Sequence, residues 1–260
     1  MATERSRPLE GRSAVVTGVG SGLGQAIARE FAAEGALVLG CDVDDAAGAA
    51  TMSGIGEYLH ADVSREAEVE ALVARAVERH GRLHVMVNNA AVQIEQELAE
   101  TTEEQLDRIL AVNLKGVFFG CQAAVRAMIP RGTGSIVNVS SAAIDFPAPG
   151  NSAYAMSKAA VAMLTMTLAV EAGPHGIRVN AIAPGVTLTN FTTRHMVKPD
   201  GTLDRSLMDE RVEQLRAMSP LGLVGEPDDQ AHLVLYLASD ASKYATGAIF
   251  RANGGVGIAW

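Results

Sequence analysis

The sequence has few cysteines, few aromatic residues and a deficit of basic residues. Its 260 residues include two cysteines, and aromatic residues make up 4% of the chain. Two cysteines cannot build a disulfide framework. Asp and Glu number 30 against 21 Lys and Arg, which gives a net charge of −9. This acidic balance, without a run of basic residues, excludes a surface for nucleic acid or for an anionic membrane.

Long hydrophobic runs are also missing. The longest uncharged apolar stretch, Ala159–Val170, is shorter than the roughly 20 residues that span a bilayer. The chain begins Met-Ala-Thr-Glu-Arg-Ser-Arg-Pro, with mixed charges and a proline where a secretory signal needs an apolar stretch. We therefore expect no membrane span, no targeting segment and a cytoplasmic location.

Hydrophobic residues nevertheless make up 48% of the chain, too many for a disordered protein. Short apolar runs alternate with segments whose apolar residues recur at helical spacing. The predicted strands are Ser13–Thr17, Ala36–Asp42, Tyr58–Asp62, Leu83–Asn88, Ser135–Val139, Ile177–Ile182 and Ala248–Arg251. The predicted helices are Gly22–Glu34, Asp44–Met52, Glu66–His80, Thr102–Ile129, Ser152–Ala172 and Pro227–Leu237.

This alternation predicts an α/β fold, a doubly wound parallel sheet with helices on both faces. No linker divides the chain, so we expect one domain over 1–260. The stretch from about 190 to 220 has no clear periodicity and is longer than most loops, which is typical of a functional insertion. Within it, Asp204–Met218 is compatible with a helix.

A glycine-rich turn, Thr17 to Gly24, joins the first predicted strand to the first helix. Glycines let a diphosphate approach the helix N-terminus, where backbone N–H groups and the helix dipole bind anions. The spacing does not fit G-x-G-x-x-G but fits T-G-x-x-x-G-x-G. It predicts a dinucleotide site and therefore a Rossmann-type domain. The proposed contacts in this turn are Gly18, Ser21, Gly22, Leu23 and Gly24.

Asp42 ends the second predicted strand, 24 residues after Gly18. A carboxylate at this place hydrogen-bonds the adenosine ribose hydroxyls and repels a 2′-phosphate. The neighbours Ser21 and Val43 are not basic, so Asp42 favours NAD over NADP. The alternative role for Asp42 is a helix N-cap, for which Asp44 is better placed.

Tyr154 and Lys158 lie four residues apart on one predicted helix and share a face. A phenol has a pKa near 10, and a nearby ammonium favours its ionised form. Such a tyrosine could exchange a proton with a hydroxyl or carbonyl oxygen. Alone, this spacing is also common in ordinary surface pairs.

The order of these motifs along the chain is more specific than any one of them. The glycine turn, Asn88-Asn89-Ala90, Asn113, Ser140-Ser141, the Tyr154/Lys158 pair and Pro184-Gly185 follow one another. Together they closely resemble the short-chain dehydrogenase/reductase family, from about Gly11 to Gly255. The resemblance implies a seven-stranded sheet in the order 3-2-1-4-5-6-7.

The resemblance also implies catalytic roles. The family's catalytic serine precedes its tyrosine by thirteen residues, which selects Ser141 over Ser140. Ser141 would hydrogen-bond the substrate oxygen, and Tyr154 would be the acid/base. Lys158 would lower the pKa of Tyr154 and bind the nicotinamide ribose. Asn113 would hold a water in a proton relay to Lys158; the alternative is a buried amide that braces its helix.

Further cofactor contacts follow from the same resemblance. Asp62 and Val63 match the adenine pocket, and Asn89 and Ala90 match the end of the fourth strand. Pro184, Gly185, Thr187 and Thr189 match the loop that holds the nicotinamide carboxamide and a phosphate. Two positions depart from the family pattern: Ala91 replaces a glycine, and Asn253 replaces an aspartate. The consequence of each replacement is open.

The expected function is an NAD-dependent oxidoreductase that transfers a hydride between nicotinamide and a secondary alcohol or ketone. One alternative is a 3-oxoacyl-(acyl-carrier-protein) reductase-like ketoreductase, although such enzymes usually prefer NADPH. A remote alternative is a non-catalytic NAD-binding regulatory protein. The family implies a homotetramer, or a homodimer, that acts on a small molecule. Substrate identity, stereochemistry and the direction of the reaction stay open.

The stretch 190–218 would close over the substrate. Its residues Phe191, Met196, Leu207 and Met208 suggest a substrate with an apolar body. The six histidines show no metal-ligand spacing, so we expect no metal site.

Overall fold

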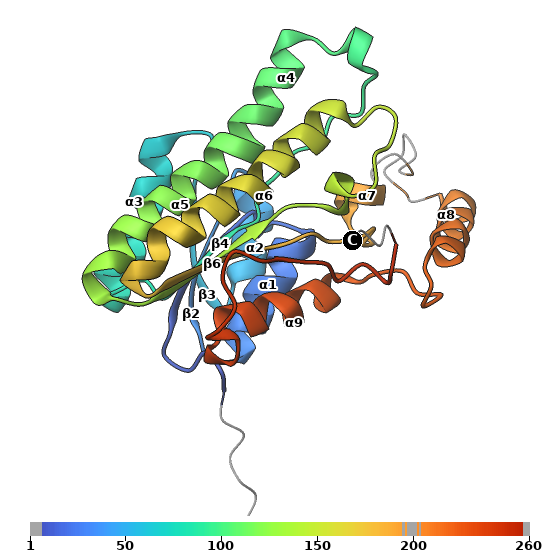
Figure 1. Cartoon of the computed structure of the whole chain (residues 1–260). Coiled ribbons are helices and arrows are strands. Elements are labelled where there is room, and N and C mark those ends of the chain that lie inside the picture. Colours follow the sequence, from blue (N-terminus) through green and yellow to red (C-terminus); the bar gives the residue numbers. More distant parts are fainter. Residues whose placement is uncertain (1–6, 194–195, 197–201, 203, 257–260) are drawn as a thin grey trace, which may run out of the picture.

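Seven parallel strands run through the centre of the computed structural model, which describes residues 7–193, 196, 202 and 204–256 (Figure 1). They pair in the order β3-β2-β1-β4-β5-β6-β7. The strands are β1 (Ser13–Thr17), β2 (Leu37–Asp42), β3 (Gly56–His60), β4 (Val85–Asn88), β5 (Gly134–Val139), β6 (Ile177–Ile182) and β7 (Ile249–Phe250). The predicted fold class and strand order are confirmed.

The predicted third strand begins and ends two residues too late. β3 pairs through Gly56–His60, with Gly56 opposite Val38 of β2. It is an edge strand whose two end residues, Gly56 and His60, are exposed. Its apolar residues Tyr58 and Leu59 are paired, but the pairing extends beyond them to Gly56 and His60, so the apolar run is a poor guide to the ends of this strand.

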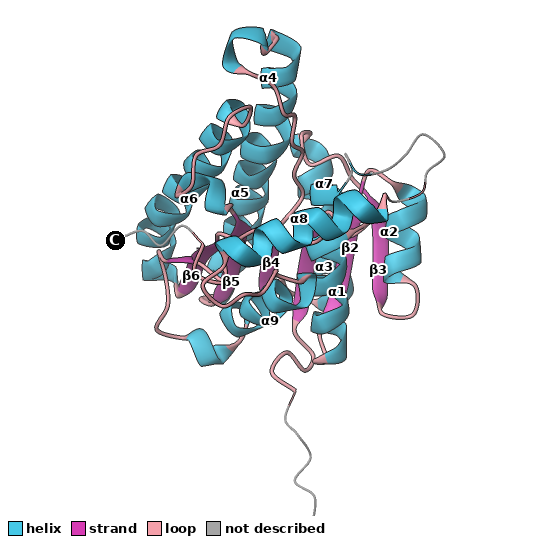
Figure 2. Ribbon diagram, turned by 90° about the vertical axis from the view of Figure 1, so that its right-hand side faces the viewer, coloured by secondary structure: helices cyan, strands magenta, loops and turns pink. Residues whose placement is uncertain are grey.

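Helices cover both faces of the sheet (Figure 2). They are α1 (Gly22–Ala33), α2 (Asp45–Met52), α3 (Glu66–His80), α4 (Glu103–Leu110), α5 (Val117–Met128), α6 (Ser152–Ala172), α7 (Asn190–Thr193), α8 (Arg205–Met218) and α9 (Pro227–Ala238). The core has two clusters: Val15 packs on the side of α3, α5 and α6, while Ala14 and Val16 pack on the side of α1 and α9. Because helices cover both faces, the central strands β1 and β4 are buried at every residue rather than at alternate ones.

The single long helix predicted over Thr102–Ile129 is interrupted. A capping box starts α4, since Thr102 Oγ1 accepts from Gln105 N and Gln105 Oε1 accepts from Thr102 N. A π-helical turn over Ala111–Gly116 then separates α4 from α5. Such turns are rare and are frequent at functional sites. This one carries Asn113.

Two helical stretches meet the length and composition of a membrane span, Glu103–Arg131 and Ser152–His175. The exclusion based on uncharged runs is therefore too strict. Both stretches flank the sheet, and 50% and 33% of their most apolar windows are buried. A core helix passes the same test, so length and composition alone do not make either stretch a membrane helix. Much of the apolar surface of α6 is left exposed.

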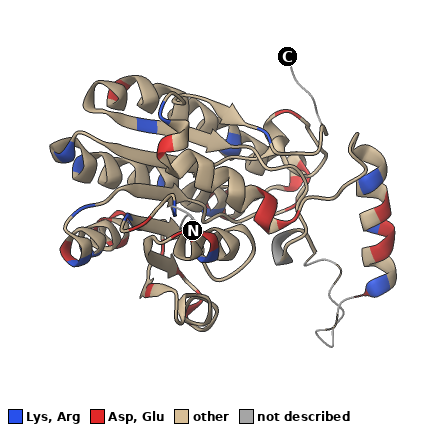
Figure 3. Cartoon of the chain, turned by 90° about the horizontal axis from the view of Figure 1, so that it is seen from below, with Lys and Arg blue, Asp and Glu red and all other residues tan. Residues whose placement is uncertain are grey.

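The helix expected within Asp204–Met218 is present as α8, and Asp204 caps it by accepting from Ser206 N at 3.1 Å. It stands away from the sheet, on the side of the strands' carboxyl ends (Figure 1). Acidic and basic residues are interspersed along it (Figure 3). Leu207 and Met218 are about half exposed, and Leu215 is buried. Residues 194–195, 197–201 and 203 of the expected insertion lie outside the described residues.

Candidate active site

The carboxyl ends of β1 and β4 are joined by one threonine. Thr17 Oγ1 accepts from Asn89 N and from Ala90 N, both at 3.0 Å. In return, Asn89 Nδ2 donates to Thr17 O at 2.8 Å and to Gly18 O at 3.2 Å. Asn89 thus holds the start of the glycine turn in place. This point between two strands is where doubly wound folds bind their ligands.

The glycine turn is packed too tightly for side chains. Gly18 has φ +74°, and a Cβ on Gly24 would lie 2.0 Å from Gly18 O. The following helix, α1, begins after Ser21, whose side chain makes no capping hydrogen bond, and its first turn carries no acidic residue. Backbone N–H groups at this helix end are therefore available to an anion. This is the structure that a diphosphate group requires.

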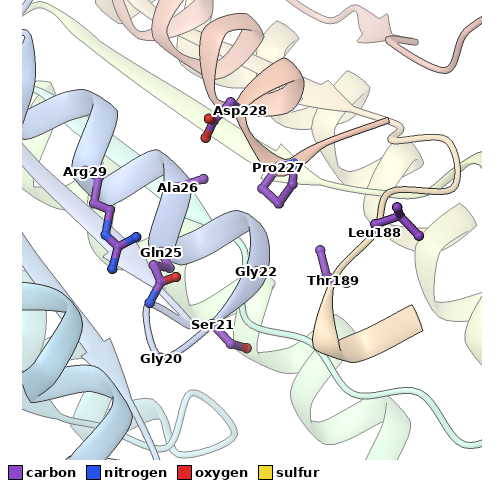
Figure 4. Close-up of a pocket in the computed structure, with 10 residues that line it drawn as sticks. All are labelled: Gly20, Ser21, Gly22, Gln25, Ala26, Arg29, Leu188, Thr189, Pro227 and Asp228. Atoms are coloured by element: carbon purple, nitrogen blue, oxygen red, sulfur yellow. The ribbon is translucent and has the colours of Figure 1, made fainter. Parts of the chain in front are cut away.

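A cavity of about 390 Å³ lies beside the turn (Figure 4). Gly20, Ser21 and Gly22 face Leu188 and Thr189 across it. Its remaining lining residues are Gln25, Ala26, Arg29, Pro227 and Asp228. The cavity therefore brings the glycine turn and the predicted phosphate-binding Thr189 to one space. The expected catalytic residues do not line it, so it lies on the phosphate side of the site.

Asp42 braces the turn with its carboxylate. Its Oδ2 accepts from Gly20 N at 2.8 Å and its Oδ1 from Asp44 N at 3.0 Å. Asp44, not Asp42, caps α2 by accepting from Ala47 N at 3.0 Å. The alternative role for Asp42 is therefore wrong. A partly exposed carboxylate remains at the end of β2.

The residues expected at the adenine pocket follow β3. Burial works to raise the pKa of Asp62, but hydrogen bonds from the Ser64 hydroxyl and N–H, with Arg108 and Arg65 nearby, lower it overall. The Ser64 hydroxyl donates to Asp62 Oδ1 at 2.7 Å. Val63 is 7% exposed and lies against Gly116 of the π-helical turn. Val63 thus adjoins the turn that carries Asn113.

Lys158 is buried in the N-terminal half of α6, with 1% of its surface exposed. Its Nζ donates to Val139 O at 2.9 Å and lies 5.7 Å from the ring centroid of Tyr154. Desolvation lowers the pKa of Lys158 to about 8. Buried ammonium groups are costly and rare, and this one lies beside the phenol ring. The predicted Tyr154/Lys158 pair shares one face, as the spacing requires.

Ser140 and Ser141 differ in what their hydroxyls do. Ser140 is 2% exposed and donates to Lys158 O at 2.9 Å, so it fastens β5 to α6. Ser141 begins a one-turn 3-10 helix, Ala142–Ile144, and its Oγ accepts from Ala143 N at 3.1 Å. That contact uses an acceptor site of Ser141, and its O–H can donate to a substrate oxygen.

The side chain of Asn113 holds a backbone segment. Its Oδ1 accepts from Val92 N and its Nδ2 donates to Val92 O, both at 2.8 Å. The Nδ2 also donates to Ser157 Oγ at 3.2 Å, and Ser157 Oγ donates to Tyr154 O at 2.7 Å. The amide therefore joins the segment after β4 to α6, the helix that carries Tyr154 and Lys158. The water relay through Asn113 stays a prediction.

The loop after β6 closes the other side of the site. Pro184 O accepts from Ala142 N at 2.9 Å, next to Ser141. Thr187 is 4% exposed, and its hydroxyl donates to Gly185 O at 3.2 Å. Of the residues expected to contact an apolar substrate, Met196 is 3% exposed and Leu207 is 50% exposed. Met208 is partly buried, whereas the side chain of Phe191 lies outside the description.

Several contacts at this site have no local sequence signal. Thr17 belongs to the recognised motif, but its hydrogen bonds to the end of β4 are long-range. Gln93 Nε2 donates to Asn151 Oδ1 at 2.6 Å and joins the segment after β4 to the start of α6. Arg251 forms a two-point ion pair with Asp145. Among the residues that the structure describes, no three His, Cys, Asp or Glu side chains gather as metal ligands do.

A doubly wound parallel sheet with a glycine turn at this point is the architecture of the dinucleotide-binding oxidoreductases. Residues 18–257 match the family described as enoyl-(acyl carrier protein) reductase. The chain is also 38% identical to the short chain dehydrogenase/reductase astE of Aspergillus oryzae, over 98% of both chains. It belongs to the short-chain dehydrogenase/reductase family, as its motifs predict.

Other relatives differ in their named reactions. The mouse (3R)-3-hydroxyacyl-CoA dehydrogenase is 39% identical, over 94% of this chain and 95% of the relative. The 3-oxoacyl-(acyl-carrier-protein) reductase FabG of Thermotoga maritima is 36% identical, over 96% of this chain and 99% of the relative. Momilactone A synthase of rice is 37% identical, over 97% of this chain and 92% of the relative. The similarity therefore defines the oxidoreductase class and leaves the substrate undefined.

Proposed function

We propose that the protein is an NAD-dependent oxidoreductase that interconverts a secondary alcohol and a ketone. The observation that supports this most is Lys158, an ammonium buried beside the ring of Tyr154. A buried charge of this kind is expensive to maintain. Its position beside the phenol is accounted for if Tyr154 gives and takes a proton, because the ammonium favours the ionised phenol.

Each catalytic residue then has one task. A bound nicotinamide would supply the hydride chemistry. Tyr154 exchanges the proton of the substrate hydroxyl, and the Lys158 ammonium favours the phenolate electrostatically. Ser141 donates its O–H to the substrate oxygen and stabilises the charge that develops there. Asn113 keeps the segment at Val92 against the catalytic helix, and we retain the water relay as part of its proposed role.

The proposed cofactor site runs along the carboxyl edge of the sheet. The turn residues Gly18, Ser21, Gly22, Leu23 and Gly24 hold the diphosphate at the start of α1. The adenosine side is formed by Asp42, Asp62, Val63, Asn89 and Ala90, and the nicotinamide side by Pro184, Gly185, Thr187 and Thr189. The tight packing of Gly24 against Gly18 O and the helix end at Ser21 support this placement.

We propose NAD rather than NADP because of Asp42. Its carboxylate is fixed by two backbone N–H groups, so it cannot easily turn away from a 2′-phosphate. The 3-oxoacyl-(acyl-carrier-protein) reductase reading is the second candidate, supported by the similarity to FabG. It carries the opposite cofactor expectation, since such enzymes usually use NADPH. The cofactor preference therefore separates the two candidates.

The remaining proposals concern assembly and surroundings. We propose one working domain in which residues 190–220 form the substrate-side insertion, and a cytoplasmic location. A homotetramer or homodimer is supported by the apolar surface of α5 and α6, where Phe118 is 47%, Met163 60% and Val170 78% exposed. Large exposed apolar side chains gathered on one face mark association surfaces.

The decisive experiment is a substrate panel with a cofactor titration. Secondary alcohols, sterols, diols and acyl thioesters are tested with NAD(H) and NADP(H), using the natural protein and Tyr154→Phe. We expect turnover by the natural protein only, with cofactor affinity unchanged in Tyr154→Phe. Turnover that persists in Tyr154→Phe would refute the mechanism. Tighter binding of NADPH than NADH would refute the role of Asp42, and an inactive natural protein would favour the regulatory reading.

A further inference from the structure

The segment 251–255 near the C-terminus contacts the turn that follows Ser141, through Asp145, and the loop that carries Gly185. We propose that Arg251, through Asp145, is a positioning residue that sets the orientation of Ser141. The inference rests on the proposed function, because it assumes that Ser141 acts on the substrate. It assigns a task to two residues that no catalytic motif includes.

The ion pair between Arg251 and Asp145 is a rigid one. Arg251 Nε donates to Asp145 Oδ2 at 2.6 Å, and Nη2 donates to Oδ1 at 3.0 Å. The carboxylate side chain of Asp145 is only 9% exposed. The third nitrogen, Nη1, donates to Ile249 O at 3.0 Å and so fixes the guanidinium to β7. A two-point fork of this kind constrains direction as well as distance.

Asp145 is connected to Ser141 through a single short turn. Ala143 N donates to Ser141 Oγ at 3.1 Å, and Ile144 N donates to Ser141 O at 3.2 Å. Asp145 N closes the turn by donating to Ala142 O at 2.9 Å. The turn is therefore held at its start by Ser141 and at its end by Arg251. If the end is released, the N–H that orients the Ser141 hydroxyl is no longer fixed.

The same segment reaches the loop on the other side of the site. The backbone of Gly185 packs so closely on Asn253 that a Cβ at Gly185 would lie 2.8 Å from Asn253 Cα. Asn253 Nδ2 donates to Val256 O at 2.6 Å, and its Oδ1 accepts from Gly255 N at 3.0 Å. An ionised aspartate cannot donate to Val256 O. The amide of Asn253 therefore stabilises the segment that carries Arg251 through a hydrogen bond that an aspartate could not make.

The segment is also tied to the chain that precedes and forms α9. Gln230 Nε2 donates to Ala252 O at 2.7 Å, and Ser219 Oγ donates to Gly254 O at 3.1 Å. Ser219 follows α8 directly. Arg251 is thus anchored on one side to the body of the protein and connected on the other to the turn that begins at Ser141.

The test compares Arg251→Gln, Arg251→Lys and Asp145→Asn with a control pair. Glu70 and Arg126 form an exposed ion pair at 2.8 Å between α3 and α5, so Glu70→Gln is the control. We expect Arg251→Gln and Asp145→Asn to lower kcat roughly tenfold, because small displacements of a reacting group are costly. Cofactor affinity is expected to stay within about twofold. Arg251→Lys keeps the charge but not the two-point hydrogen bonding. Its kcat is expected to lie between that of the natural protein and that of Arg251→Gln.

A second measurement does not depend on turnover. Hydrogen exchange of the amides at residues 142–146 is expected to become faster in Arg251→Gln and Asp145→Asn and to stay unchanged in Glu70→Gln. Unchanged exchange and unchanged kcat in both variants would overturn the proposal. So would a fall in kcat accompanied by an equal loss of cofactor affinity. If the natural protein converts no substrate, the proposed function fails, while the exchange data still decide whether Arg251 holds the turn.

Discussion

At the amino ends of β1, β4 and β5, polar groups are bonded to one another and to the main chain. Ser13 N donates to His84 Nδ1 at 2.9 Å, the Ser13 hydroxyl bonds His80 Nδ1 at 2.9 Å, and Ser135 Oγ donates to Leu237 O at 2.8 Å. At the carboxyl ends, the comparable groups hold loops. Thr17 holds Asn89 and Ala90, and Ser141 starts the turn toward Asp145.

The difference lies in what the bonded groups are attached to. At the amino edge, each polar group satisfies a neighbour in a fixed element. At the carboxyl edge, each one fixes a glycine turn, a loop or a helix that carries a further reactive or anion-binding group. We therefore expect these polar contacts to support stability at the amino edge and function at the carboxyl edge. Substitutions at the two edges should separate these effects.

The largest effect is expected for Lys158→Met, at the carboxyl edge. Methionine fills a similar volume but removes the ammonium, so kcat/KM should fall by about a thousandfold, within the range for lost acid–base catalysis. Burial lowers the pKa of Lys158 to about 8, which corresponds to roughly 3 kcal/mol of destabilisation of the ammonium. Losing the hydrogen bond to Val139 O lowers the free energy of unfolding by a similar amount, roughly 1–3 kcal/mol.

These two contributions nearly cancel in the free energy of unfolding. Thermal unfolding of Lys158→Met should therefore occur within about 5 °C of the natural protein. Activity is measured by steady-state kinetics and unfolding by calorimetry. Retained activity, or unfolding at room temperature, would contradict the separation of function from stability at this edge.

The second prediction concerns pH. The pKa of Lys158 is about 8 because burial disfavours its charged form. The ammonium to which we assign a catalytic role is present below that pH and is lost as the pH rises through it, so kcat should fall about tenfold per pH unit above roughly pH 8. The natural protein and His84→Asn, altered at the amino edge, should show the same fall. A flat profile to about pH 9.5 would show that Lys158 does not control the rate.

The third prediction compares the two ends of β1. Thr17→Val removes the acceptor of two N–H groups, those of Asn89 and Ala90. It should destabilise the fold by about 2–4 kcal/mol and weaken cofactor binding, because the glycine turn loses its support. Ser13→Ala loses only the bond between the Ser13 hydroxyl and His80 and should cost about 1 kcal/mol.

Cofactor affinity by fluorescence titration separates these two variants. We expect it to fall only in Thr17→Val. If Thr17→Val and Ser13→Ala bound the cofactor equally well, the carboxyl end of β1 would not support the cofactor site more than its amino end does.

Much of this fold is readable from local patterns. The predicted Ser13–Thr17, Ile177–Ile182, Glu66–His80 and Ser152–Ala172 coincide with β1, β6, α3 and α6, because each has a clear apolar period or run. The π-helical turn at Ala111–Gly116 has no such signal. It exists where Asn113 bonds Val92, 21 residues away in the chain, and local propensity carries no information about that pairing.

The candidate site divides in the same way. The spacing of Tyr154 and Lys158 places them on one helix face, so their neighbourhood follows from the sequence. The pairing of Asp145 with Arg251 joins residues 106 positions apart and depends on how β7 docks beside β6. Asn253 appears in the sequence only as a departure from the family pattern, and its role becomes visible through the hydrogen bonds of its amide to Val256 O and Gly255 N.

The smallest effect is expected at His84, on the amino edge. Burial, with Arg82, Arg12 and His80 nearby, lowers the pKa of His84 from 6.5 to about 4, and its Nδ1 accepts from Ser13 N. The unfolded chain therefore binds a proton at higher pH than the folded one. The stabilisation is complete above about pH 6.5 and is lost as the pH falls toward about 4.

Replacing His84 with asparagine keeps an acceptor near the Nδ1 position and removes the titration. The melting temperature of His84→Asn should fall by a few degrees less than that of the natural protein between about pH 6.5 and 4.5. Cofactor affinity at pH 7 should not change, because His84 lies at the edge remote from the glycine turn. If the melting temperatures of both proteins fell equally across that pH range, His84 would not titrate as described. A change in cofactor affinity would show that the two edges are coupled.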